Sequence, residues 1–130
     1  MLRRVIEKTL MAEEATISPN VMEYVYSKDA AWSTLLAAEA KNLKSRVYNV
    51  GMGSVSNPGA IIEIIKEMIP SARISVEESS TGKPTITVQE PVDPNRSKQE
   101  LGYEPQYDMP KALNDYIDWY GGPDSSTASN

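Results

Sequence analysis

The sequence predicts a small α/β domain with short strands and about five helices. Segments with helical spacing of apolar residues alternate with short runs of β-branched and aromatic residues. Residues that cap or end helices, chiefly Asp, Asn, Gly and Pro, stand at the borders of the helical segments. The chain has 130 residues, enough for one domain that buries roughly two-thirds of its unfolded surface.

Two helices and one strand are expected in the first third of the chain. Apolar residues recur on one face over residues 2–11, which predicts a helix. A break at residues 17–20 precedes Val21–Tyr26, whose β-branched and aromatic residues favour a strand. Asp29 can cap an alanine-rich helix over Ala30–Lys41, because its carboxylate accepts from first-turn amides. We expect this helix to lie in the core, since its alanines permit close packing.

A second strand and a third helix follow. The strand covers Arg46–Val50 and leads into Gly51-Met52-Gly53. Asn57 provides a cap and Pro58 a first-turn residue for a helix that Pro70 ends. This order superficially resembles the phosphate-binding start of a dinucleotide fold, but the third glycine is missing. We therefore interpret the two glycines as a tight turn that reverses the chain.

Two further short strands, over Arg73–Glu77 and Thr85–Val88, flank a loop with a composition typical of ligand-contacting segments. This loop, residues 78–84, contains Lys83 as a candidate anion contact. The loop is not a phosphate-binding loop, because the upstream glycine of that motif is missing and Pro84 removes an amide donor.

The last part of the chain predicts two more helices. Asp93 and Pro94 open a short helix, and Gly102 suits the left-handed position after it. Asp108 begins the final helix, whose apolar and aromatic stripe is expected to pin it onto the core, with partner binding as the alternative. Residues 122–130 are expected to form a disordered tail.

Composition excludes several classes of site. Histidine and cysteine are absent, which removes disulfides, thiolate nucleophiles, imidazole bases and the usual zinc sites. The formal net charge is −5 with scattered basic residues, so nucleic-acid binding is not expected. No apolar run approaches the roughly 20 residues that span a bilayer, so we expect a cytoplasmic protein without a membrane partner. Seven tyrosines and two tryptophans, with no phenylalanine, place the aromatic residues near surfaces, interfaces or a cleft.

No set of residues predicts catalysis by this chain. Two Tyr-x-x-x-Lys spacings occur, from Tyr24 to Lys28 and from Tyr107 to Lys111. Such a spacing matters when a helix stacks a phenol on an ammonium group, but the first pair lies in an expected strand and the second precedes a helix. We interpret both spacings as coincidence, and paired carboxylates as solvated surface charge.

Three segments, in order, resemble motifs of the extended short-chain dehydrogenases/reductases, the NAD-dependent epimerase/dehydratase family. They are Val25–Ala31 (V-x-x-x-D-x-A), Val47–Gly53 (Y-N-x-G-x-G) and Asp93–Pro105 (ending L-G-Y-x-P). The resemblance covers Leu2 to Tyr120. It implies that residues 1–121 form the C-terminal substrate-binding lobe of such an enzyme. The Rossmann half, which carries the cofactor turn and the catalytic tyrosine and lysine, has no counterpart here.

The resemblance also implies the partners of the chain. Its parent protein is expected to bind NAD or NADP, whereas this chain is expected to bind no cofactor and to be inactive alone. Arg96 matches a family position that is often basic, which makes it a candidate substrate-binding residue beside Lys83. A salt bridge or helix-terminus contact is the alternative role of Arg96. In the family an arginine often binds phosphate at the position that Met22 occupies here. The resemblance therefore gives less support to a UDP-sugar as the substrate.

Three hypotheses about function follow. The first is a substrate-binding fragment of an NAD(P)-dependent nucleotide-sugar epimerase or dehydratase, with a sugar nucleotide as ligand and a Rossmann domain as partner. The second is a stand-alone, non-enzymatic interaction module that works through its Tyr- and Trp-rich faces. The third is the lobe of a reductase that acts on a non-nucleotide substrate. Under the first hypothesis we expect exposed apolar surface and formation of homo-oligomers.

Overall fold

The computed structural model describes residues 2–78 and 86–121. Within these ranges it contains five helices and four short strands, which confirms the predicted α/β class. In chain order the elements are α1 (Leu2–Leu10), β1 (Ala15–Ile17), β2 (Met22–Glu23), α2 (Ser27–Glu39), β3 (Val55–Ser56), α3 (Pro58–Met68), β4 (Ile74–Val76), α4 (Asn95–Leu101) and α5 (Met109–Gly121). No helix in the described part of the chain is long and apolar enough to cross a membrane.

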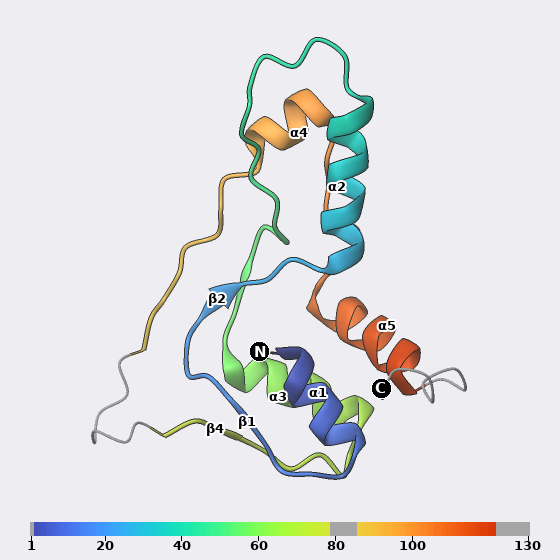
Figure 1. The fold of residues 1–130 in the computed structure, drawn as a ribbon. Coiled ribbons are helices and arrows are strands. Elements are labelled where there is room, and N and C mark those ends of the chain that lie inside the picture. The colour runs from blue at the N-terminus through green and yellow to red at the C-terminus, as the bar shows by residue number, and fades with distance from the viewer. Residues whose placement is uncertain (1, 79–85, 122–130) are drawn as a thin grey trace.

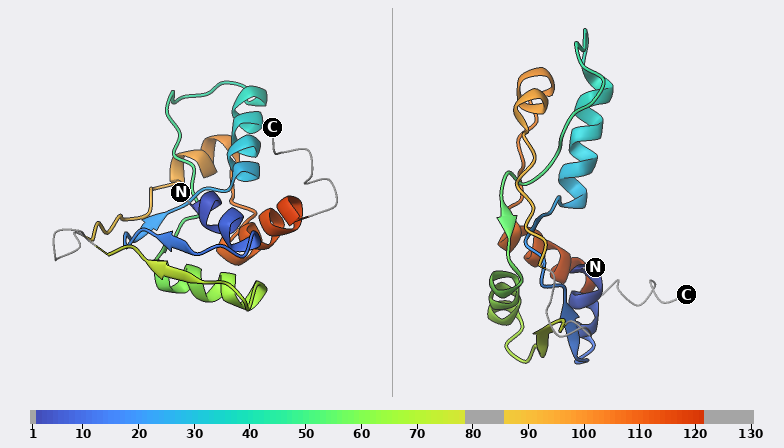
Figure 2. Two further views of the ribbon diagram at one scale, coloured as in Figure 1. Left: turned by 60° about the horizontal axis from the view of Figure 1, so that its bottom comes forward. Right: turned by 90° about the vertical axis from the view of Figure 1, so that its left-hand side faces the viewer.

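The elements separate into two ends (Figure 1). Helices α1, α3 and α5 gather at one end with strands β1 and β4, whereas α2 and α4 lie at the other end. Strand β1 pairs in parallel with β4, with Ala15 opposite Ile74, and β2 pairs antiparallel with β3, with Met22 opposite Ser56. The views in Figure 2 show that α2 and α4 extend away from the three-helix end. Each sheet has two strands, so helices and loops carry most of the architecture.

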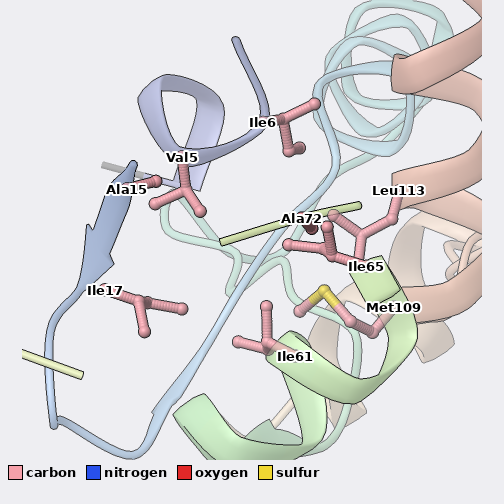
Figure 3. Close-up of a cluster of buried hydrophobic side chains, with 9 residues drawn as sticks. All are labelled: Val5, Ile6, Ala15, Ile17, Ile61, Ile65, Ala72, Met109 and Leu113. Atoms are coloured by element: carbon pink, nitrogen blue, oxygen red, sulfur yellow. The ribbon is translucent and has the colours of Figure 1, made fainter. Parts of the chain in front are cut away.

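The hydrophobic core lies at the three-helix end (Figure 3). It joins α1, β1, α3 and α5. Its buried residues are Val5, Ile6, Ala15, Ile17, Ile61, Ile65, Ala72, Met109 and Leu113. The predicted buried faces of the first and third helices are confirmed, and so is the core role predicted for the final helix.

Local signals set several helix ends as predicted. The Asn57 side chain accepts a hydrogen bond from the Ala60 amide at 2.8 Å, and the Asp108 carboxylate accepts from the Lys111 amide at 2.9 Å. Each bond satisfies an amide of the first helical turn that has no partner within the helix. Gly102 follows α4 with a φ of 69°, in the left-handed region that glycine adopts without strain.

Asp93 lies one position before the N-cap of α4 and not at the N-cap, as was predicted. The cap position of α4 is Pro94, and the Asp93 carboxylate accepts from the Asn95 amide at 2.9 Å. The aspartate therefore still satisfies an amide at the start of the helix.

The expected capping role of Asp29 is wrong. Helix α2 begins at Ser27, so Asp29 lies in its first turn and is almost fully buried. Its carboxylate accepts from the amides of Gln106 and Tyr107, at 3.0 and 3.1 Å. The sequence pattern predicted that the Asp29 carboxylate accepts from amides of α2. It accepts instead from amides of the loop before α5.

The predicted core position of the alanine-rich helix is also wrong. Asp29 and Ser33 are the buried residues of α2. Trp32 and Leu35 remain 38% and 46% exposed. The helix lies at the end opposite the hydrophobic core, against α4 (Figure 1), so its apolar side chains meet solvent.

Some predicted strands are absent or shorter than expected, because no neighbouring strand pairs with their residues. Residues 46–50 form no strand among the described residues, and Val47 is 68% exposed. Strand β2 covers two of the residues expected over 21–26, and Val21 adds a single parallel bridge to Val88. A β-branched segment becomes a strand only where a neighbouring strand supplies partners. Thr85 and the tail at 122–130 lie outside the described residues.

The left-handed residue after α4 offers a test of the fold. A Cβ at residue 102 would meet no atom within 4 Å, so Gly102→Ala introduces backbone strain without a steric clash. We expect it to lower the free energy of unfolding by about 1 kcal/mol in urea titrations. Gly121→Ala is the matched control, because that position in α5 is also open and lies outside the left-handed region. Equal effects of both substitutions would contradict the backbone explanation.

Candidate functional site

A groove of about 510 Å³ lies between α1 and α5, closed at one side by the segment that joins β2 to α2. Its lining is mostly apolar and aromatic. The residues that line it are Leu2, Arg3, Ile6, Tyr24, Val25, Tyr26, Ser27, Lys28, Met52, Met109, Ala112, Leu113, Asp115, Tyr116 and Trp119. A volume of this size with a few polar groups is typical of a small-molecule site.

Aromatic side chains form much of the groove wall. Tyr24 and Tyr26 come from the β2–α2 segment, and Tyr116 and Trp119 come from α5. The rings of Tyr116 and Trp119 lie 5.6 Å apart, and Trp119 remains 67% exposed. Flat, exposed rings of this kind can stack on a ligand ring. The expectation that the tyrosines and tryptophans gather at surfaces or a cleft is confirmed for these four residues.

A polar cluster lies at one edge of the groove. The Tyr26 hydroxyl donates to Asp115 at 2.5 Å, and the Lys28 ammonium donates to the same carboxylate at 2.8 Å. The bond from Lys28 and then that from Tyr26 hold the pKa of Asp115 below its ordinary value. Burial, followed by the bond to Asp115, raises the pKa of Tyr26. At neutral pH the cluster therefore contains a neutral phenol, a carboxylate and an ammonium group.

Tyr107 extends this cluster. Its ring centroid lies 4.7 Å from that of Tyr26, and the ammonium nitrogens of Lys111 and Lys28 lie 4.6 and 5.9 Å from it. The sequence analysis expected no stacking between Tyr107 and Lys111, which is wrong. The start of α5 turns the lysine back over the ring and forms a cation–π contact.

Arg96, one of the two predicted substrate-binding residues, does not line the groove. Arg96 is exposed on α4, at the end of the molecule opposite α1 and α5 (Figure 1), and its guanidinium donates to the Val47 carbonyl at 3.3 Å. Lys83 lies outside the described residues. Met22, at the position of the missing arginine, is half-buried on β2. Of the two candidate substrate-binding residues, Arg96 is the one within the described residues, and it lies away from the groove.

Hydrogen bonds hold the helix of Arg96 against residues 44–49. Ser97 donates to the Asn49 carbonyl, and Asn49 donates to the Asp93 carbonyl at 3.1 Å. The Glu100 carboxylate accepts from the Ser45 and Tyr48 hydroxyls, both at 2.8 Å, and these two bonds lower the pKa of Glu100. Arg96 therefore has a fixed backbone and an exposed guanidinium with one backbone contact. That contact to a loop carbonyl is neither the salt bridge nor the helix-terminus contact expected as the alternative, and the ligand role stays a prediction.

The glycine turn does not fit a dinucleotide cofactor. A Cβ at Gly51 would lie 2.3 Å from a carboxylate oxygen of Glu23, so an anionic side chain already fills the space beside the turn. A pyrophosphate would meet like charge there. Strand β3 also separates Gly53 from α3, whereas the cofactor turn leads directly into a helix. Over residues 2–78 and 86–121, no three acidic, histidine or cysteine side chains gather as a metal site.

Most of the groove could not be predicted from the sequence. Its lining residues come from α1, from residues 24–28, from the glycine turn at Met52 and from α5, which are far apart in the chain. The excess of tyrosine indicated a cleft without locating it. The ion pair of Lys28 with Asp115 joins residues 87 positions apart, so no spacing pattern could have indicated it.

The chain matches no protein-family model and no curated protein, but it matches solved structures. It resembles a UDP-glucose 4-epimerase from Thermotoga maritima, solved with UDP-glucose, with 24% identity, a TM-score of 0.73, and coverage of 91% of this chain and 38% of that one. It also resembles a UDP-glucuronic acid 4-epimerase from Bacillus cereus in complex with UDP-glucuronic acid and NAD. The identity is 25%, the TM-score is 0.69, and the match covers 89% of this chain and 38% of that one. A third similar structure is a GalE-like L-threonine dehydrogenase from Cupriavidus necator. The identity is 21%, the TM-score is 0.71, and the match covers 88% of this chain and 43% of that one.

These structures share their fold with almost the whole of this chain. The chain spans about two-fifths of the length of each, from 38% to 43%. The likeness therefore concerns one part of a larger molecule.

The Tyr26–Lys28–Asp115 cluster generates a pH-dependent prediction. The pKa of Asp115 is lower in the folded chain than its ordinary 3.8, so its stabilisation is present above 3.8 and is lost as the pH falls through the folded value. We expect Asp115→Asn to lower the free energy of unfolding by about 1 kcal/mol at neutral pH, a modest loss because Lys28 is exposed.

Urea titrations from neutral pH to well below 3.8 measure this difference, which should narrow on the acid side. Asp118→Asn is the matched control, because this exposed carboxylate on the same helix contacts the neutral amide of Asn114. A difference that stays constant at every pH would contradict the role of the ionised carboxylate.

Proposed function

We propose that this chain, which has the fold of part of an extended short-chain dehydrogenase/reductase, is the substrate-binding lobe of an NAD(P)-dependent nucleotide-sugar epimerase or dehydratase. The observation that carries the proposal is the match of 89–93% of the chain to structures named as UDP-sugar epimerases. The lobe comprises residues 1–121. It binds substrate and does not catalyse the reaction alone.

This division of labour agrees with the chemistry of the described residues. Hydride transfer requires a bound nicotinamide and an aligned proton donor. The turn at Gly51 and Gly53 does not fit the cofactor, because the Glu23 carboxylate fills the adjacent space. We therefore assign NAD or NADP, and the catalytic groups, to a partner Rossmann domain.

Lys83 and Arg96 are the proposed ligand contacts. A diphosphate favours guanidinium groups, which can donate two parallel hydrogen bonds. Arg96 uses one nitrogen on the Val47 carbonyl and keeps an exposed side chain, so its other donors remain available to a ligand. Lys83 would supply a second positive charge.

A second candidate function has support of its own. Met22 cannot bind phosphate, and one of the structures of similar fold is a threonine dehydrogenase. The lobe of an enzyme with a small, non-nucleotide substrate is therefore the alternative. The aromatic groove and its charged edge, rather than Arg96, would then contact the substrate.

Calorimetric titration of the purified chain with UDP, UDP-glucose and NAD tests the proposal. We expect both uridine ligands to bind and NAD to give no heat. Arg96→Ala should weaken UDP-glucose binding about tenfold, since one charge-assisted contact is lost. Lys83→Ala should have a similar effect.

Lys98→Ala is the control for these titrations. Lys98 is an exposed cation on the same helix and pairs with Glu104, so its loss should leave binding unchanged. Binding of NAD would contradict the proposal. Silence toward the uridine ligands in a monomeric chain would favour the stand-alone interaction module.

A second test concerns the surface proposed to meet the partner domain. Leu35 on α2 is an exposed apolar residue, and so is Val47, whose carbonyl accepts from Arg96 of the neighbouring helix α4. We expect the isolated chain to self-associate as its concentration rises, because association covers this surface. Leu35→Lys combined with Val47→Lys should shift sedimentation velocity profiles toward the monomer.

Thr34→Lys is the matched control for Leu35→Lys alone, since each adds one positive charge at an exposed position of α2. It should not change association. A wild-type chain that stays monomeric over a wide concentration range would contradict the proposed packing surface.

A further inference from the structure

The Glu23 carboxylate joins two segments that are distant in the chain. One of its oxygens accepts from the Gly53 amide at 2.6 Å, and the other accepts from the Val92 amide at 2.7 Å. Glu23 itself belongs to β2, where it pairs with Val55 of β3. A strand, a glycine turn and the segment that leads into α4 therefore meet at one carboxylate.

Both glycines of the turn serve this contact. A Cβ at Gly51 would lie 2.3 Å from the Glu23 oxygen, so the carboxylate can reach the turn only because residue 51 has no side chain. Gly53 has a φ of 76° with open space around it, and this backbone conformation directs its N–H toward the carboxylate. On the other side, the buried Tyr103 hydroxyl donates to the Gly51 carbonyl at 3.2 Å.

The contact reaches the helix that carries Arg96. Val92 precedes Asp93 and Pro94, and the Pro94 carbonyl accepts from the Lys98 amide of α4 at 2.9 Å. Val92 therefore lies three residues before Asn95, the first residue of α4.

We infer that the Gly53 and Val92 amides form a receptor for one carboxylate, which Glu23 occupies, and that Glu23 is thereby a positioning residue for α4. Two converging N–H groups are a typical anion-binding arrangement of backbone. A carboxylate offers an acceptor to each amide. A glutamine side chain offers one acceptor and places an NH₂ group against the other amide.

Removal of the side chain should leave a site for a small external carboxylate. The inference depends on no nucleotide ligand, so its test is independent of the proposed function. The probe is formate, added to Glu23→Ala against chloride at constant ionic strength. Backbone amides are followed by NMR chemical shifts and hydrogen exchange.

In Glu23→Ala we expect the Gly53 and Val92 amides to exchange about tenfold faster than in the wild type, because each loses a charge-assisted bond. The Lys98 amide of α4 should also exchange faster. Formate should shift the Gly53 and Val92 signals saturably and slow all three amides. The wild type should not respond, because Glu23 already fills the receptor.

Glu63→Ala, which removes an exposed carboxylate of α3, is the matched control and should not respond to formate. Glu23→Gln preserves side-chain size and should leave one of the two amides less protected, which decides the question if the alanine variant does not fold. Full protection of both amides in Glu23→Gln would overturn the inference. So would a folded Glu23→Ala that gives no saturable response to formate.

Discussion

Backbone amides outside regular sheets need acceptors, and in this chain carboxylates provide several of them. Glu23, Asp29 and Glu100 each accept from two backbone amides that are distant in the chain, and for Glu23 the two amides belong to different segments. The described strands are two or three residues long. Hydrogen bonds between strands therefore satisfy few backbone amides, and those of the connecting segments need other acceptors. Side chains on β2, α2 and α4 therefore hold loops that no strand borders. The end of the molecule farthest from the hydrophobic core depends most on these bonds.

The sequence predicted best those features that neighbouring residues determine. Asn57 and Gly102 set helix ends through contacts or backbone angles within a few positions, so their roles were readable from local pattern. Residues 46–50 show the limit of this reading. They have strand propensity, but no described strand pairs with them to form a ladder. Asp29 shows the same limit, since its amide partners lie 77 and 78 positions away.

The resemblance to extended short-chain dehydrogenases/reductases agrees with the fold, whereas the placement of the candidate site was only partly foreseen. Arg96 is exposed, as a ligand contact requires, but it lies away from the aromatic groove. The groove depends on four segments that only tertiary packing brings together: α1, residues 24–28, the glycine turn at Met52 and α5. Tyrosine content indicated that a cleft would be aromatic. It could not indicate that Asp115 would neutralise Lys28 at its edge.

The carboxylate of Glu23 and the bare α-carbon of Gly51 occupy adjoining space, so the two positions cannot vary independently. Any side chain at residue 51 would displace the glutamate, and a shorter residue at 23 would remove the reason for a glycine at 51. In genetic terms the two sites are epistatic. A substitution at Gly51 that is harmful beside Glu23 would be tolerated, or even beneficial, once residue 23 has been shortened. The pair would then change together over evolutionary time, and the order of the two changes would matter.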